Sequence, residues 1–275
     1  MKKIIIALFL MLSSFVLATD WDSASALKRV NTIGTKILKA NNINHTIEFK
    51  VSAEDTINAY ANIDKEIYVY KGLLEYVDTD DELAGVISHE MGHIINGHCA
   101  KQGVLNSIIA TIGSWFKPTT TVGSVTNAVG QQLAASKISR NDEFEADLTG
   151  VDLMTKGGYN PLGMVSLLSK ISQSYLDILQ SHPSGEKRIQ NAYDYINYNY
   201  PSYISKGYST ESYKNALSAM KSTLDTRKSS EAEMAKYKKA QEKLLAKKQK
   251  REKKMQGTST VWDGYYQTLL YTSGN

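Results

Sequence analysis

The strongest constraint on the fold of this chain lies in residues 79–98, which read TDDELAGVISHEMGHIINGH. Thr79 and Glu82 have the spacing of a capping box, and Asp80 and Asp81 add negative charge to the first turn, where the helix dipole is positive. Apolar residues then recur at helical spacing: Leu83, Val86, Ile87, Met91, Ile94 and Ile95. The pattern predicts a helix with a sharp start and a mostly buried surface.

Three of the five histidines fall in this stretch. Residues four apart share a helix face, so His89 and His93 project side by side, with Glu90 next to the first of them. Two imidazoles on one face suit Zn²⁺, and the intervening carboxylate can take a proton from a water that the metal has made acidic and give it to a leaving amine. A chance match in a buried helix is the alternative; we favour a catalytic zinc site.

A zinc ion that keeps one position open for water needs a third protein ligand. His98 is near, but five residues from His93 place it about 140° round the helix. Its spacing also differs from the His-x-x-Gly-x-x-His pattern of other zinc peptidases. We therefore expect His98 to support the site or to pack, and Cys99 to be a small core residue.

Carboxylates for the site are predicted in residues 138–154, ISRNDEFEADLTGVDLM, whose apolar spacing indicates a second buried helix. Glu143 and Asp147 are four apart on it, whereas Glu145 points elsewhere. One carboxylate could close the zinc site, and the other could accept the free N–H of a ligating histidine. A solvated, acidic helix start would explain the same charges, but beside the histidine pair we favour the role at the metal.

Three blocks of the chain, in order, resemble the HtpX and CAAX-prenyl-protease type of zinc peptidase, and most closely its secreted, BepA-like branch. The blocks are INAYANIDKEIYVYKGLLEYVDTDDELAGVISHEMGHIINGH, SRNDEFEADLTG and SHPSGEKRI, and the resemblance covers roughly residues 25–195. The chain departs from that family in lacking the Pro-Gly-Gly turn common before the last strand, and no segment after the first reaches the length of a membrane span.

The resemblance implies an endopeptidase with a compact helical core and a small sheet. It implies His89, His93 and Glu143 as the ligands of one Zn²⁺ per chain, Glu90 as the general base, and Asp147 as a support of the site. The substrate class that it implies is unfolded or misassembled envelope protein.

The resemblance also places the loop QSHPSGEKRIQNAY near the metal, and this loop contains His182. His182 could stabilise the oxyanion that forms on the peptide carbonyl. It could instead take the open position on zinc and hold the enzyme latent, or merely cap the following helix. Arg188 and Arg140 are expected to pair with nearby carboxylates.

The elements predicted elsewhere complete an α+β fold. Residues 22–41 have helical apolar spacing, whereas 45–52 and 66–74 alternate as strands do. We predict a mainly helical zincin domain of the minigluzincin type over residues 19–205, with a small β-sheet, followed by a long C-terminal helix.

The first residues, MKKIIIALFLMLSSFVLATD, have two lysines before an apolar run and small residues at a cleavage site after about Ala18. We predict a signal peptide over residues 1–18, since the run is short for a membrane anchor. The chain has one cysteine, which rules out an internal disulfide. Signal and resemblance together favour the periplasm, either in solution or peripheral to a membrane.

A basic helical arm is predicted over residues 206–256, and residues 227–254 contain twelve basic and four acidic side chains. Residues 257–275 form an aromatic tail. The arm is either a solvated charged helix or, through residues 227–271, a docking surface for an anionic membrane or an envelope protein. Nucleic acid is not expected as a partner of an exported protein.

These features predict an exported zinc-dependent endopeptidase that degrades unfolded or misassembled envelope proteins. The alternative is a chaperone-like protein that binds such clients and has a structural or latent zinc site. Glu90 argues against that alternative, since a structural site needs no base between its ligands.

Overall fold

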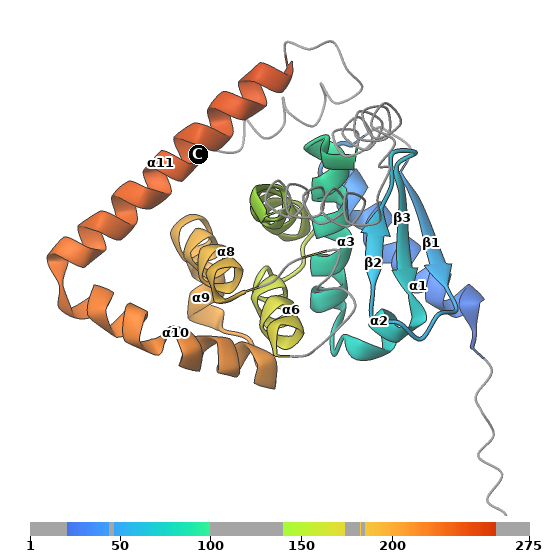
Figure 1. Cartoon of the computed structure of the whole chain (residues 1–275), viewed down its shortest axis with the longest axis horizontal. Coiled ribbons are helices and arrows are strands. Elements are labelled where there is room, and N and C mark those ends of the chain that lie inside the picture. The colour runs from blue at the N-terminus through green and yellow to red at the C-terminus, as the bar shows by residue number, and fades with distance from the viewer. Residues whose placement is uncertain (1–20, 44–46, 100–139, 174–181, 183–184, 257–275) are drawn as a thin grey trace, which may run out of the picture.

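The computed structural model describes residues 21–43, 47–99, 140–173, 182 and 185–256. The predicted signal peptide and the aromatic tail lie outside these ranges. Within them the chain is mostly helical, with one small sheet on one side (Figure 1). The predicted α+β class, with a C-terminal helix after the main body, is therefore confirmed.

The sheet has three strands in the order β1-β3-β2. They are β1 (Glu48–Ser52), β2 (Ala59–Ala61) and β3 (Glu66–Tyr70). β1 pairs with β3 in parallel, and β2 pairs with β3 in antiparallel orientation. Helix α1 (Ser23–Ala40) packs on β1, as its predicted amphipathic pattern requires.

The strand predicted over residues 66–74 is wrong after Tyr70, where the chain enters the short helix α2 (Lys71–Tyr76). The cause is a close approach of two backbones. The amide of Gly72 donates to the carbonyl of Glu54, and a Cβ atom at position 72 would lie 2.0 Å from the carbonyl oxygen of Asp55. Only glycine fits there, so the chain turns away from the sheet.

Helix α3 (Asp80–Ile95) begins where predicted and is buried along nearly its whole length. The hydroxyl of Thr79 accepts from the amide of Glu82 at 3.1 Å. Glu82 does not return the bond to Thr79 as a capping box would; its carboxylate accepts from the amide of Asp78 at 2.7 Å and from the hydroxyl of Ser166 at 2.6 Å. The cap thus also ties α3 to its neighbouring helix.

The remaining helices pack on the side of α3 away from the sheet (Figure 1). A helix over residues 140–156 crosses α3, α6 packs along α3, and α8 and α10 pack on α6. Their bounds are α6 (Leu162–Ser172), α8 (Glu186–Asn199), α9 (Pro201–Lys206), α10 (Glu211–Ser229) and α11 (Glu231–Gln256). No helix in the described ranges has both the length and the apolar character needed to cross a bilayer.

The predicted basic arm consists of two helices, α10 and α11, that meet at Ser230. One face of this arm packs against the body of the protein. Arg227 forms an ion pair with Asp194, and the hydroxyl of Tyr237 donates to the backbone carbonyl of the same aspartate at 3.0 Å. Near the other end of α11, Lys248 pairs with Asp152 on the helix over residues 140–156. Part of the arm's positive charge therefore holds it against the body.

Candidate metal centre

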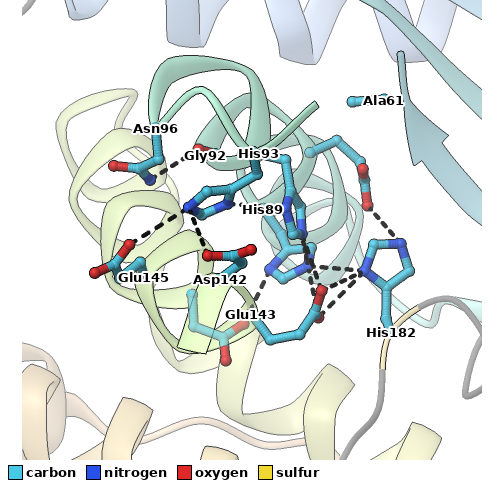
Figure 2. Close-up of polar contacts among 12 residues, drawn as sticks. Ala61, His89, Gly92, His93, Asn96, Asp142, Glu143, Glu145 and His182 are labelled. Atoms are coloured by element: carbon cyan, nitrogen blue, oxygen red, sulfur yellow. Dashed lines mark hydrogen bonds and ion pairs between the residues drawn. The ribbon is translucent and has the colours of Figure 1, made fainter. Parts of the chain in front are cut away.

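The two predicted histidine ligands meet the predicted carboxylate (Figure 2). The Nε2 atoms of His89 and His93 lie 3.0 Å apart. Glu143, from the helix over residues 140–156, places Oε2 3.3 Å from Nε2 of His89 and Oε1 3.2 Å from Nε2 of His93. The one-turn spacing on α3 thus brings all three donors to one point.

His182 completes a set of four donor groups. Its Nδ1 lies 3.2 Å from Nε2 of His89 and 3.2 Å from each carboxylate oxygen of Glu143. A tetrahedral ion with bonds of about 2.0–2.1 Å has ligand atoms about 3.3 Å apart. The spacing and the nitrogen and oxygen chemistry of the donors fit such an ion, so the cluster is able to hold a metal.

Small residues allow the two helices that carry these donors to approach. A Cβ atom at Gly92 would lie 2.7 Å from the carbonyl oxygen of Ala146, and one at Gly150 would lie 3.0 Å from the amide nitrogen of His89. Backbone therefore meets backbone at the crossing. This contact is what lets the short side chain of Glu143 reach the histidines.

Glu90 is buried beside the donor set rather than in it. Its Oε1 lies 3.4 Å from Nε2 of His182, whereas the other ring nitrogen, Nδ1, faces the donor set. Glu90 is therefore placed to exchange a proton with a molecule bound next to the cluster.

The second nitrogen of His89 faces the predicted supporting carboxylate. Nδ1 of His89 lies 3.0 Å from Oδ1 of Asp147. Arg188, from α8, donates from Nε and Nη2 to Asp147 at 2.7 Å each, and its Nη1 lies 2.8 Å from Oε2 of Glu143. Such outer contacts fix the tautomer and orientation of a ligating imidazole. Arg140 is exposed at the first residue of its helix, so of the two predicted arginines only Arg188 is at the cluster.

In the cluster, the charges of neighbouring groups shift the pKa values more than burial does. Burial alone would raise the pKa of Glu143, but the imidazoles of His182 and His89 hold it well below its usual range. Burial also opposes ionisation of Asp147, yet the guanidinium of Arg188 lowers the pKa of that carboxyl. Burial disfavours a charged His89, and the carboxylates of Glu143 and Asp147 overcome this and raise its pKa to about 10. Both carboxylates are therefore anionic at neutral pH, as a metal site requires, whereas His89 carries a proton that a metal ion would have to displace.

The position predicted for His98 is wrong, because α3 ends before it. The helix stops at Ile95, Gly97 adopts a positive φ of 72°, and the chain turns back. His98 thereby brings its Nδ1 within 3.1 Å of Nδ1 of His93. Cys99 is half-buried against the core, and its thiol donates to the carbonyl of Ala61 at 3.6 Å.

An apolar recess opens beside Glu90, His182 and Arg188. Its other walls come from α6 and α3: Val86, Met164, Leu167, Leu168 and Ile171. No motif in the sequence marks α6 or these residues as part of a site.

Comparison with known proteins agrees with this arrangement. The profile of Peptidase family M48 matches residues 25–196, which is more than half of the chain and contains every residue of the cluster. The chain belongs to peptidase family M48. The resemblance drawn from the three sequence blocks is confirmed at the level of this family.

Among its M48 relatives, the metalloprotease LoiP of Escherichia coli is 31% identical over 178 residues, which are 61% of this chain and 69% of LoiP. The beta-barrel assembly-enhancing protease of Yersinia pestis is 27% identical over 184 residues, 59% of this chain. The mitochondrial metalloendopeptidase OMA1 of Arabidopsis thaliana is 30% identical over 145 residues, 51% of this chain. The match covers only 37% of the Yersinia protein and 30% of OMA1.

Proposed function

We propose that this M48 protein is a zinc-dependent endopeptidase. The observation that carries the proposal is the tetrahedral spacing of four donor groups, with the buried carboxylate of Glu90 directly beside them. Membership of a peptidase family and the names of its relatives, which include metalloproteases and a metalloendopeptidase, support the same activity.

In this proposal His89, His93 and Glu143 hold the metal. Two imidazoles and one carboxylate are the donor set of many catalytic zinc sites. A bound Zn²⁺ supplies Lewis-acid chemistry: it lowers the pKa of a water molecule and polarises the carbonyl of the bond to be cut. Asp147 and Arg188 keep the ring of His89 oriented and Glu143 ionised.

Glu90 is the general base. It accepts a proton from the attacking water and returns it to the nitrogen of the leaving peptide, so the same carboxylate acts twice. Its burial and its place outside the donor set suit this role, because a base must lie beside the metal without binding it.

His182 supports a latent resting state. Its Nδ1 takes the fourth corner of the donor set, the corner that a catalytic site keeps for water and substrate. We infer that this ring leaves its place before a substrate carbonyl can enter. Donation to the oxyanion is the alternative role of this ring, and it would require the ring to stay close to the reacting carbonyl.

The recess next to Glu90 and His182 would take an apolar side chain of the substrate. Unfolded and misassembled proteins present such side chains in extended segments. Among the described strands, β2 lies at an edge of the sheet and has a strand neighbour on one side only. The beta-barrel assembly-enhancing proteases among its relatives support envelope proteins as substrates and the periplasm as the compartment. The exposed lysines of α11 would face an anionic membrane surface or an envelope partner, within residues 227–271.

The first experiment compares the purified mature protein with its Glu90→Gln variant. Zinc is measured by elemental analysis, and cleavage is measured on casein, an unfolded protein. We expect one zinc per chain in both forms and cleavage only by the unchanged protein. Cleavage by the variant at an equal rate would exclude Glu90 as the base.

The second candidate function is that of a client-binding protein with a structural zinc. The closed set of four protein donors favours it, because structural sites are closed in this way. The two functions separate if the His182→Ala variant is included. If both forms bind a full equivalent of zinc and neither cleaves casein at any pH between about 6 and 9, the client-binding function is favoured.

A further inference from the structure

Both ring nitrogens of His93 are engaged. Its Nε2 faces Glu143 and His89 in the donor set, and its Nδ1 lies 3.1 Å from Nδ1 of His98. Nε2 must offer a lone pair to a metal, so the proton of the neutral ring sits on Nδ1. His93 therefore donates this proton, and Nδ1 of His98 accepts it.

The tautomer of His98 follows from the same bond. A neutral ring that accepts at Nδ1 carries its proton on Nε2. That atom lies 3.4 Å from Oε2 of Glu145 and 3.7 Å from Oδ1 of Asp142. Glu145 and Asp142 thus fix the ring of His98 in the form that serves His93.

The C-terminal helix α11 supplies the last member of this chain of contacts. Arg251 forms an ion pair with Glu145 through Nη1, and its Nη2 donates to the backbone carbonyl of Asn96 at 3.1 Å. Asn96 is the C-terminal cap of α3. One guanidinium therefore joins the end of the helix that carries His93 to the carboxylate that holds His98.

The groups of His98, Asp142 and Glu145 are close enough to suggest a second cation site. The guanidinium of Arg251 on Glu145 argues against it, because a permanent positive charge already occupies that carboxylate. The chain of contacts instead mirrors the one at His89, where Asp147 faces Nδ1 and Arg188 holds Asp147.

We propose that His98 is the positioning residue of His93, and that Arg251, acting through Glu145, makes α11 a working part of the metal centre. This proposal rests on the proposed zinc site. It assigns a role to the C-terminal arm that neither its basic composition nor its amphipathic pattern indicates.

The first test separates hydrogen bonding from packing at position 98. The His98→Asn variant retains an acceptor near the place of Nδ1, whereas His98→Leu fills the space without one. Zinc affinity is measured by competition with a chromogenic chelator. We expect His98→Leu to lose about 10–100-fold in affinity and His98→Asn to lose much less. A packing role would reverse this order, because leucine suits a buried site better than asparagine, and that order would overturn the proposal.

The second test compares two charge removals on α11. Arg251→Met and Lys253→Met remove the same charge, but Lys253 is exposed. We expect Arg251→Met to weaken zinc binding several-fold and to lower kcat more than it changes KM, with Lys253→Met unchanged. Glu145→Gln, which preserves shape, should weaken zinc binding to a similar degree as Arg251→Met and serves if the arginine variant folds poorly. Equal zinc affinity in all three variants would overturn the role of Arg251.

These outcomes distinguish the inference from the proposed function. If the unchanged protein binds zinc and cleaves casein while the variants at 98, 145 and 251 match it, only the inference fails. If the unchanged protein binds no zinc, both fail together.

Discussion

The ring of His182 touches both the donor set and the base: Nδ1 lies 3.2 Å from Nε2 of His89, and Nε2 lies 3.4 Å from Oε1 of Glu90. A plug at this corner must be removed before substrate binds, whereas an oxyanion donor must stay close. The two roles make opposite demands on the same side chain, so substitution at this one residue separates them.

We predict that His182→Ala raises the turnover of a peptide substrate several-fold while the protein keeps its zinc. The reason is that nitrogen competes well with water for the metal, so its loss frees the corner for substrate. Steady-state kinetics with parallel elemental analysis is the measurement. A variant that keeps its zinc but no longer cleaves would show instead that the ring stabilises the oxyanion.

The sequence predicted most of the site at this scale. A spacing of four put His89 beside His93 and Glu143 beside Asp147, each pair on one face of a helix. The family resemblance, and not the spacing, assigned Glu143 to the metal and Asp147 to its support. His98 was misplaced because helix arithmetic assumes that the helix continues past Ile95. Nothing in one sequence places Arg251 beside Glu145, since that contact depends on how distant helices pack.

Among the elements, the crossing of α3 with the helix over residues 140–156 determines whether the cluster can form. At Gly92 the two backbones touch, and an added methyl group would meet the carbonyl oxygen of Ala146 at 2.7 Å. At Gly85, on the same helix, an added methyl group would meet only the backbone of Met164 at 3.4 Å, an ordinary contact.

We predict that Gly92→Ala lowers the free energy of unfolding by about 1–3 kcal/mol and weakens zinc binding, because the helices must separate. The matched variant Gly85→Ala should be neutral or stabilise the protein by up to about 1 kcal/mol, since alanine favours a helix. Urea unfolding and chelator competition test both. If the two variants behave alike, the close crossing does not control the site.

Element prediction succeeded where signals were long or specific. Helices α1 and α3 have many periodic residues and clear caps, so their bounds were nearly correct. β2 has only three residues, too few for an alternation to be recognised. The helical arm predicted over residues 206–256 was not divided at Ser230, although Ser230 and Glu233 have the spacing of a capping box and the hydroxyl of Ser230 accepts from the amide of Glu233 at 3.3 Å.

At the scale of the whole molecule, the half of the fold built from α8 to α11 contains tyrosines whose hydroxyl groups resist ionisation. Burial, the leading cause in each case, raises the pKa values of Tyr200, Tyr213 and Tyr237 to about 12. Tyr200 donates from its hydroxyl to Asp152 at 2.7 Å, and Tyr237 donates to the carbonyl of Asp194. A tyrosinate could make neither bond.

The sign of the pH effect follows from these shifts. A raised pKa in the folded state means that the unfolded chain loses its protons first, near pH 10. The contribution is complete below about pH 10 and is lost as the pH rises toward 12. We predict that the urea midpoint falls steeply between about pH 10 and pH 12, and falls less steeply in Tyr200→Phe, which has one such group fewer. Parallel curves for the two proteins would contradict the assignment.

The order of these parts along the chain has a consequence for biosynthesis. The ribosome makes the histidines of α3 first, then Glu143 and His182, and α11 after all of them. Until α11 has folded back, Glu145 lacks its ion pair with Arg251. All the proposed metal donors are therefore synthesised before the contacts that hold His98 are complete. If His98 and Arg251 act as proposed, a nascent chain that lacks α11 would therefore bind zinc more weakly than a chain in which α11 has folded back.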